Sequence, residues 1–119
     1  VVNAITHDKK GQLLNTNADS IASALATSLA TDHLVNLYFC FNKAGVLVDE
    51  KNENSIIPLI NEDIYAELRK ENVIHSGMIP KLDNAFEALQ KGVSRVIIGD
   101  ALDIEKLIAG KAGTTIQKN

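Results

Sequence analysis

The sequence predicts an α/β fold, in which an open, mainly parallel sheet carries helices on both faces as an αβα sandwich. Apolar runs typical of strands alternate with segments of helical periodicity along the chain. A helix beginning at Pro80 leads after a minimal turn into a strand over 93–99, as in alternating α/β layers. With 119 residues, 45% of them hydrophobic, the chain is long enough for one core, so we expect residues 1–119 to form a single domain.

The first elements are a short hairpin and an alanine-rich helix. The apolar runs Val1–Ile5 and Gln12–Leu14 flank a polar turn over 7–11, which indicates a hairpin or a broken edge strand. Helical spacing then predicts a helix from about Ala18 to Thr31, whose small alanines favour close packing against a sheet. The larger residues that repeat every four positions are Ile21, Leu25 and Leu29.

A buried strand and a second hairpin are expected next. Leu34–Phe41 is apolar and rich in strand formers, so we expect a buried strand with Cys40 as a core residue. The segments 44–48 and 55–59 are strand-like and flank a turn-rich stretch at 49–54, which predicts a hairpin.

The second half alternates helices and strands. Asn61 is a plausible N-cap for a helix that ends before Val73. A further helix runs from Pro80 to a C-terminal cap at Gly92. The remaining elements are a strand over 93–99, a short helix over 102–109 and a last strand over 114–116.

Composition excludes several classes of partner. The net charge is −3 and the 12 basic residues are spread along the chain, so we expect no nucleic-acid partner. The longest apolar run, Leu34–Phe41, is far shorter than the roughly 20 residues that cross a bilayer. The start of the chain lacks a signal-peptide pattern and its single cysteine has no disulfide partner, which favours the cytoplasm. The absence of an initiator methionine suggests a fragment.

Familiar catalytic and metal-binding motifs are absent from the sequence. His7, His33 and His75 are far apart and lack neighbours at metal-ligand spacing, so we expect no metal site built by this chain. Neither a nucleophile elbow nor a glycine-rich phosphate loop of the common kinds is present. A phosphate site in this chain would therefore depend on helix N-termini and on lysine.

Two helix starts carry unusual polar groups. Lys81 lies in the first turn of the Pro80 helix, where the helix dipole disfavours a cation by a few tenths of a kcal/mol, so an anion such as phosphate would explain it. Asn15, Asn17 and Asp19 lie at the start of the alanine-rich helix. Simpler interpretations remain open at this point: Asn17 and Asp19 as helix caps, and Lys81 as a solvated lysine.

Three segments, in this order, carry a specific resemblance. Asn15–Asp19 reads N-T-N-A-D, Gly45–Leu47 reads G-V-L, and Gly77–Leu82 reads G-M-I-P-K-L. Together they resemble the C-terminal, nucleotide-binding half of the acetylglutamate kinases, in the amino acid kinase family, over essentially all of the chain. The fold implied is the C-terminal half of the amino acid kinase fold.

The resemblance implies transfer of the γ-phosphoryl group of ATP to the side-chain carboxylate of N-acetyl-L-glutamate, a step of arginine biosynthesis. It also implies small-molecule substrates, Mg²⁺ held mainly by the nucleotide phosphates, and a homo-oligomeric full-length protein. The second catalytic lysine and the glycine-rich loops of the family belong to an N-terminal half that this chain lacks. The 119 residues alone are therefore expected to be inactive.

Matching positions assign roles to individual residues. Lys81 would stabilise charge on the transferring phosphoryl group, Asp19 would hold the catalytic lysines, and Asn15 would hydrogen-bond the acyl-amino acid. The residues that would contact the nucleotide are Asn42, Lys43, Ala44, Gly45, Val46, Leu47, Val73, Ile74 and His75.

Two alternatives follow from departures in the pattern. The turn after the Leu34–Phe41 strand has Asn42-Lys43 where many family members have an aspartate, and together with the missing half this favours a non-catalytic nucleotide-binding or regulatory module. The second alternative is a member of the same superfamily that phosphorylates another acceptor, such as a carbamate, an aspartate or a nucleoside monophosphate. The Asn15–Asp19 motif argues against that one.

Overall fold

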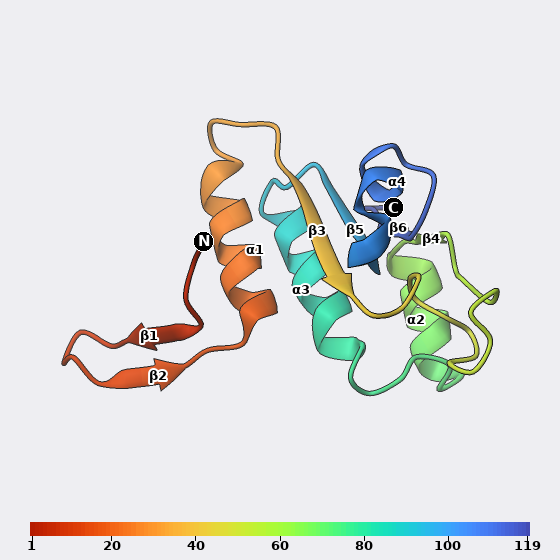
Figure 1. The fold of residues 1–119 in the computed structure, drawn as a ribbon, viewed down its shortest axis with the longest axis horizontal. Helices are drawn as coiled ribbons and strands as arrows, with labels where there is room; N and C mark the ends of the chain where they lie inside the picture. Colours follow the sequence, from red (N-terminus) through yellow and green to blue (C-terminus); the bar gives the residue numbers. More distant parts are fainter.

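The computed structural model describes residues 1–119 (Figure 1). Strands and helices alternate, and each expected helix is present. In chain order the elements are β1 (Ile5–His7), β2 (Leu13–Asn15), α1 (Ala18–Leu29), β3 (Asn36–Phe41), β4 (Leu59–Ile60), α2 (Glu62–Lys70), α3 (Ile79–Gln90), β5 (Arg95–Asp100), the 3-10 turn η1 (Ala101–Asp103), α4 (Ile104–Ile108) and β6 (Thr114–Ile116). The expected cap glycine, Gly92, follows α3 with φ +107°, a conformation that favours glycine.

The main sheet has the strand order β3-β5-β6-β4. β3 runs parallel to β5 and β4 runs parallel to β6, while β5 and β6 are antiparallel. The hairpin expected at the N-terminus is present as the antiparallel pair β1–β2, separate from this sheet. The prediction of an open, mainly parallel sheet is confirmed, with one antiparallel pair at its centre.

Helices cover both faces of the sheet. Val96 and Ile98 of β5 belong to the buried cluster that α3 also enters. The alternate residue Gly99 faces Leu107 of α4, because a Cβ built on Gly99 would lie 2.5 Å from a Leu107 methyl group. Gly113 leaves room for the same methyl group, and its φ of +77° also favours glycine.

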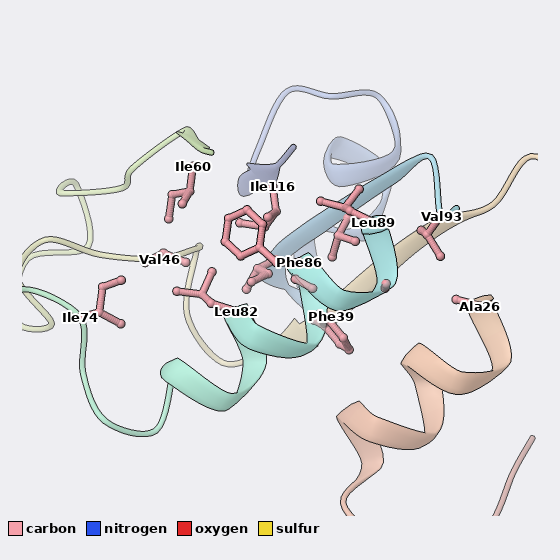
Figure 2. Close-up of a cluster of buried hydrophobic side chains, with 14 residues drawn as sticks. Ala26, Phe39, Val46, Ile60, Ile74, Leu82, Phe86, Leu89, Val93 and Ile116 are labelled. Carbon is pink, nitrogen blue, oxygen red and sulfur yellow. The ribbon is translucent and has the colours of Figure 1, made fainter. Parts of the chain in front are cut away.

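The core lies between α3 and the sheet (Figure 2). Leu82, Phe86 and Leu89 recur at helical spacing on the buried side of α3. They face buried side chains from β3, β4 and β6, among them Phe39 and Ile116. Burial of each such side chain contributes about 1.5 to 3 kcal/mol, so this stripe fixes α3 on the sheet.

Helix α1 packs mainly beside α3, with a smaller contact to β3, rather than flat against the sheet as expected (Figure 1). Its alanine side is the inward one: Ala26 is buried, whereas Leu25 and Leu29 are exposed. Small side chains let two helices approach closely, and the Ser23 hydroxyl donates to the Asn84 carbonyl of α3 across this contact.

The expected hairpin over 44–48 and 55–59 is reduced to one antiparallel bridge, between Leu47 and Ile56. In a regular ladder, Val46 and Ile57 would exchange two backbone hydrogen bonds. Only the bond from the Ile57 N–H to the Val46 carbonyl forms. The hydroxyl of Thr114 bridges the other two groups, accepting from Val46 and donating to Ile57.

The expectation of a fully buried strand over Leu34–Phe41 was wrong. β3 begins at Asn36 and lies at the edge of the sheet, paired only with β5. Phe39 is its one buried residue, and Cys40, expected in the core, is exposed. The reason is the alternation of side chains along an edge strand: Leu37, Phe39 and Phe41 contribute to the core, and Cys40 points to the opposite face.

Candidate functional site

One edge of the molecule gathers a strand end and two helix starts (Figure 1). β3 ends at Phe41, and the N-termini of α1 and α3 lie at the same edge. The first backbone N–H groups of a helix have no partner within the helix and carry partial positive charge. Two such termini side by side form a place where an anion is stabilised.

The two helices begin in different ways. Asn17 caps α1, since its side-chain oxygen accepts from the backbone N–H groups of Asp19 at 2.8 Å and Ser20 at 3.4 Å. The capping interpretation of Asn17 is therefore confirmed. Helix α3 starts after Met78 with Pro80 in its first turn, and no side chain caps it. No side chain therefore caps the N–H groups of Ile79 and Lys81, and Pro80 has no N–H.

Lys81 and Asp19 meet between these helix starts. The Lys81 ammonium donates to both carboxylate oxygens of Asp19, at 2.9 and 2.8 Å. The two side chains are only 16% and 25% exposed, so the pair is partly shielded from water. Asp19 is thus the anion that accompanies the lysine at its unfavourable helix position, and bonds between charged groups are stronger than neutral ones.

An aromatic ring completes the surroundings of the lysine. The Lys81 nitrogen lies 5.1 Å from the centre of the Phe39 ring, within the range of cation–π attraction. Phe39 is 4% exposed and belongs to the core cluster. Sequence reasoning placed Phe39 in the core and missed this contact, because nothing local to position 39 indicates a lysine from a distant helix.

A small cavity of about 40 Å³ lies beside the start of α3. This volume has room for a few water molecules and is well below the roughly 300 to 1,000 Å³ of ligand pockets. The lining residues that the sequence resemblance assigned to the nucleotide are Lys43, Gly45, Val46, Leu47, Ile74 and His75. The lining residues that it missed are Phe41, Glu50 and Met78.

Two residues that line this cavity make contacts with glutamates. Lys43 lies 3.9 Å from Glu53, and His75 lies 3.6 Å from Glu50. The Lys43–Glu53 ion pair is well exposed, and pairs of this kind contribute about 1 kcal/mol or less. The His75 Nδ1 atom accepts a hydrogen bond from the Gly77 N–H at 3.2 Å. Its distance of 3.6 Å from the Glu50 carboxylate is too long for a hydrogen bond.

Gly45 has a packing reason to be glycine. A Cβ atom there would lie 2.7 Å from the Thr114 hydroxyl oxygen and 3.2 Å from the Thr114 nitrogen. Thr114 in turn holds the backbone of Val46, another lining residue. The structure therefore adds Thr114 as a support of the cavity wall.

Some expected site residues are not brought to this place. Asn42 and Ala44 do not line the cavity, and Val73 borders a shallower hollow beside it. Asn15 ends β2, where it pairs with Ile5, and is exposed. No hydrogen bond joins Asn15 to Asp19 or to Lys81.

The α2 and α3 helices are tied together next to the cavity. The Tyr65 hydroxyl donates to the Asp83 carboxylate at 2.6 Å, and the Tyr65 ring stacks on Phe86 at 5.2 Å. Partial burial, reinforced by the hydrogen bond to Asp83, raises the pKa of Tyr65 to about 12. The loop between these helices supplies Ile74 and His75 to the cavity.

Two further observations concern metals and membranes. No group of three or more histidine, cysteine, aspartate or glutamate side chains is arranged to hold a metal ion. None of the helices has the length and apolar character that a membrane span requires.

Sequence relatives share the region described. An acetylglutamate kinase of Cytophaga hutchinsonii is 51% identical over 108 residues, covering 91% of this chain and 41% of that protein. An acetylglutamate kinase of Phocaeicola vulgatus is 45% identical over 118 residues, covering 99% of this chain and 44% of that protein. The chain thus spans about two fifths of the length of these curated relatives.

Solved structures agree on the fold. A protein of Streptococcus mutans UA159 superposes with a TM-score of 0.75 at 32% identity, over 96% of this chain and 40% of that one. The carbamate kinase from Giardia lamblia bound to AMP-PNP has a TM-score of 0.74 over 97% of this chain and 41% of its own; at 22% identity this likeness concerns the fold alone. Residues 1–100 match the model of the amino acid kinase family. The chain belongs to the amino acid kinase family.

Proposed function

We propose that this chain is the nucleotide-binding half of an acetylglutamate kinase, which transfers the γ-phosphoryl group of ATP to the side-chain carboxylate of N-acetyl-L-glutamate. The observation that carries the proposal is the Lys81–Asp19 pair between two helix N-termini, beside a small, mainly apolar cavity. The names of the relatives at 45% to 51% identity support the choice of acceptor.

Lys81 acts on the reacting phosphoryl group. Lysine has three N–H donors, and Asp19 accepts two of them, which leaves one for a phosphate oxygen. Phosphoryl transfer requires positioning and positive charge near the transferring group more than covalent help from the protein. Asp19 keeps the ammonium in place, and the N-terminus of α3 adds positive potential on the same side.

The nucleoside part of ATP lies over this cavity and against its lining residues. Its apolar lining includes Val46, Leu47 and Ile74. Lys43 is the one lysine in that lining. The Asp19 carboxylate is already bound to Lys81, so the Mg²⁺ that accompanies ATP is held mainly by the nucleotide phosphates.

The acceptor site is shared with the rest of the protein. Asn15, at the end of the exposed hairpin, hydrogen-bonds the acyl-amino acid. The relatives are more than twice as long as this chain, and the remaining catalytic groups come from the other part. The 119 residues alone are inactive, and the full-length protein is a cytoplasmic homo-oligomer.

The test is an assay of the full-length protein with ATP, Mg²⁺ and a panel of acceptors. We expect transfer to N-acetyl-L-glutamate and none to carbamate, aspartate or a nucleoside monophosphate. Lys81→Ala should lower kcat by about 10²- to 10³-fold, while calorimetry still detects ATP binding.

Each contrary outcome has a separate meaning. Full activity of Lys81→Ala would remove the role given to that lysine. ATP binding with no transfer to any acceptor would favour a non-catalytic module, and transfer to another acceptor would place the protein in a different branch of the family.

A further inference from the structure

The Phe39 ring lies beneath the head group of Lys81. The distance from the lysine nitrogen to the ring centre is 5.1 Å, and the ring is 4% exposed. Figure 2 shows Phe39 between α3 and α1, the two helices that supply Lys81 and Asp19. The aromatic face and the carboxylate therefore approach the same ammonium group from different elements.

We propose that Phe39 is a positioning residue for phosphoryl transfer: the face of its ring holds the Lys81 ammonium at the reacting phosphoryl group. This inference rests on the proposed function, because it assigns Lys81 to the transferring group. Phe39 itself does not touch the substrate. It acts through the lysine.

The chemistry of the contact explains why a ring serves here better than another polar group. The lysine side chain is a flexible four-carbon stem, and the two bonds to Asp19 draw its nitrogen towards α1. A second oxygen acceptor would take the remaining N–H donor. The negative face of an aromatic ring attracts the charge and is a weak hydrogen-bond acceptor, so a phosphate oxygen can claim that donor.

Strand β3 also fixes the position of Lys81 relative to the candidate nucleotide cavity. Phe39 and Phe41 lie on the same face of β3, because side chains two positions apart point to one side of a strand. Phe39 contacts the lysine, and Phe41 lines the cavity. A single rigid element therefore sets the position of Lys81 relative to the cavity.

The test replaces Phe39 in the full-length kinase with phenylalanines that carry one, two and three ring fluorine atoms. Fluorine removes negative potential from the ring face with little change of shape, so core packing is nearly unchanged. We expect log kcat to fall in step with each added fluorine, by roughly tenfold in all, with KM for ATP changed less than twofold. The same series at Phe86, which stacks on Tyr65 in the core, is the matched control and should leave kcat unchanged.

A second readout does not depend on turnover. An aromatic ring shifts nearby protons, so the Lys81 ε-methylene protons, assigned with the help of Lys81→Arg, should resonate upfield of those of the other lysines. Cyclohexylalanine at position 39, an aliphatic ring of similar size, should remove this shift and lower kcat as much as the most fluorinated ring.

The outcomes separate the two proposals. If the enzyme is active but its kcat does not change with fluorine at position 39, the role of Phe39 is overturned and the kinase assignment stays intact. The same conclusion follows if fluorine at position 86 lowers kcat as much as fluorine at position 39. A lysine spectrum without the upfield shift overturns it as well. Absence of transfer by the unmodified full-length protein overturns the proposed function and, with it, this inference.

Discussion

The side-chain hydroxyl of Thr114 accepts a hydrogen bond from the backbone N–H of Val46 at 2.9 Å, although the two residues lie 68 positions apart. The same hydroxyl donates to the Ile57 carbonyl at 2.7 Å. Thr114 of β6 thereby bridges the two segments of the reduced hairpin, 44–48 and 55–59. The first of these segments lines the candidate nucleotide cavity.

Thr114→Val tests this bridge. Valine keeps the shape of the side chain but leaves a buried N–H and a carbonyl without their partner, so the free energy of unfolding should fall by about 2 to 4 kcal/mol. Urea unfolding of the full-length protein measures it. Thr115→Val is the control, since the neighbouring Thr115 side chain makes no hydrogen bond and should tolerate the change. Equal stability of the two variants would contradict the bridge.

Gly45→Ala should destabilise the protein through the same threonine. The added Cβ would lie 2.7 Å from the Thr114 oxygen, and overpacking of this kind costs about 1 to 3 kcal/mol. Combining it with Thr114→Ala should cost less than the sum of the single changes, because the smaller side chain removes the clash. Gly77→Ala, where a Cβ finds ordinary contact distances, is the comparison. Additive effects in a thermal unfolding series would exclude the clash.

Asp19→Asn should loosen the hold of α1 on the lysine. The amide keeps one hydrogen-bond acceptor but loses the negative charge and the second oxygen, so Lys81 is held less firmly. We expect kcat to fall by roughly 10- to 100-fold with little change in KM for ATP. Asp32→Asn, at an exposed carboxylate without an ion pair, should retain normal rates in the same coupled assay. An unchanged kcat for Asp19→Asn would refute the holding role.

Alkaline pH should weaken the link between α2 and α3. The pKa of Tyr65 rises from 10.0 to about 12 in the folded protein, so its contribution to stability is complete below pH 10 and is lost as the pH rises towards 12. Tyr65→Phe should therefore be less stable than the parent at pH 8, and the difference should shrink between pH 10 and 12. Tyr38→Phe provides the comparison, because the hydroxyl of Tyr38 makes no hydrogen bond. A difference that stays constant with pH would argue against the raised pKa of Tyr65.

Local sequence signals predicted the helices well, and the structure shows why. Asn17 and Asn61 cap α1 and α2 through contacts within a few residues, which the sequence displays directly. The pairing of Lys81 with Asp19 was expected only through the family resemblance, since 62 positions separate the two residues. Composition and periodicity alone would not have joined them.

The remaining features depend on contacts between distant segments. An apolar run does not reveal how many strands lie beside it, so Cys40 was assigned to the core although β3 is an edge strand. The periodicity of α1 is compatible with either its leucines or its alanines on the buried face. The alanines are buried because α1 packs closely against α3. Phe39 and Thr114 gained their roles from residues far along the chain.

The bond between Tyr65 and Asp83 closes the intervening chain into a ring. That ring contains Ile74, His75 and Met78, which line the cavity. Because its ends are joined in the free protein, much of the conformational entropy of this segment is lost during folding rather than when a ligand arrives. The cavity wall is thus preorganised, and a nucleotide would meet it with little further ordering of the chain.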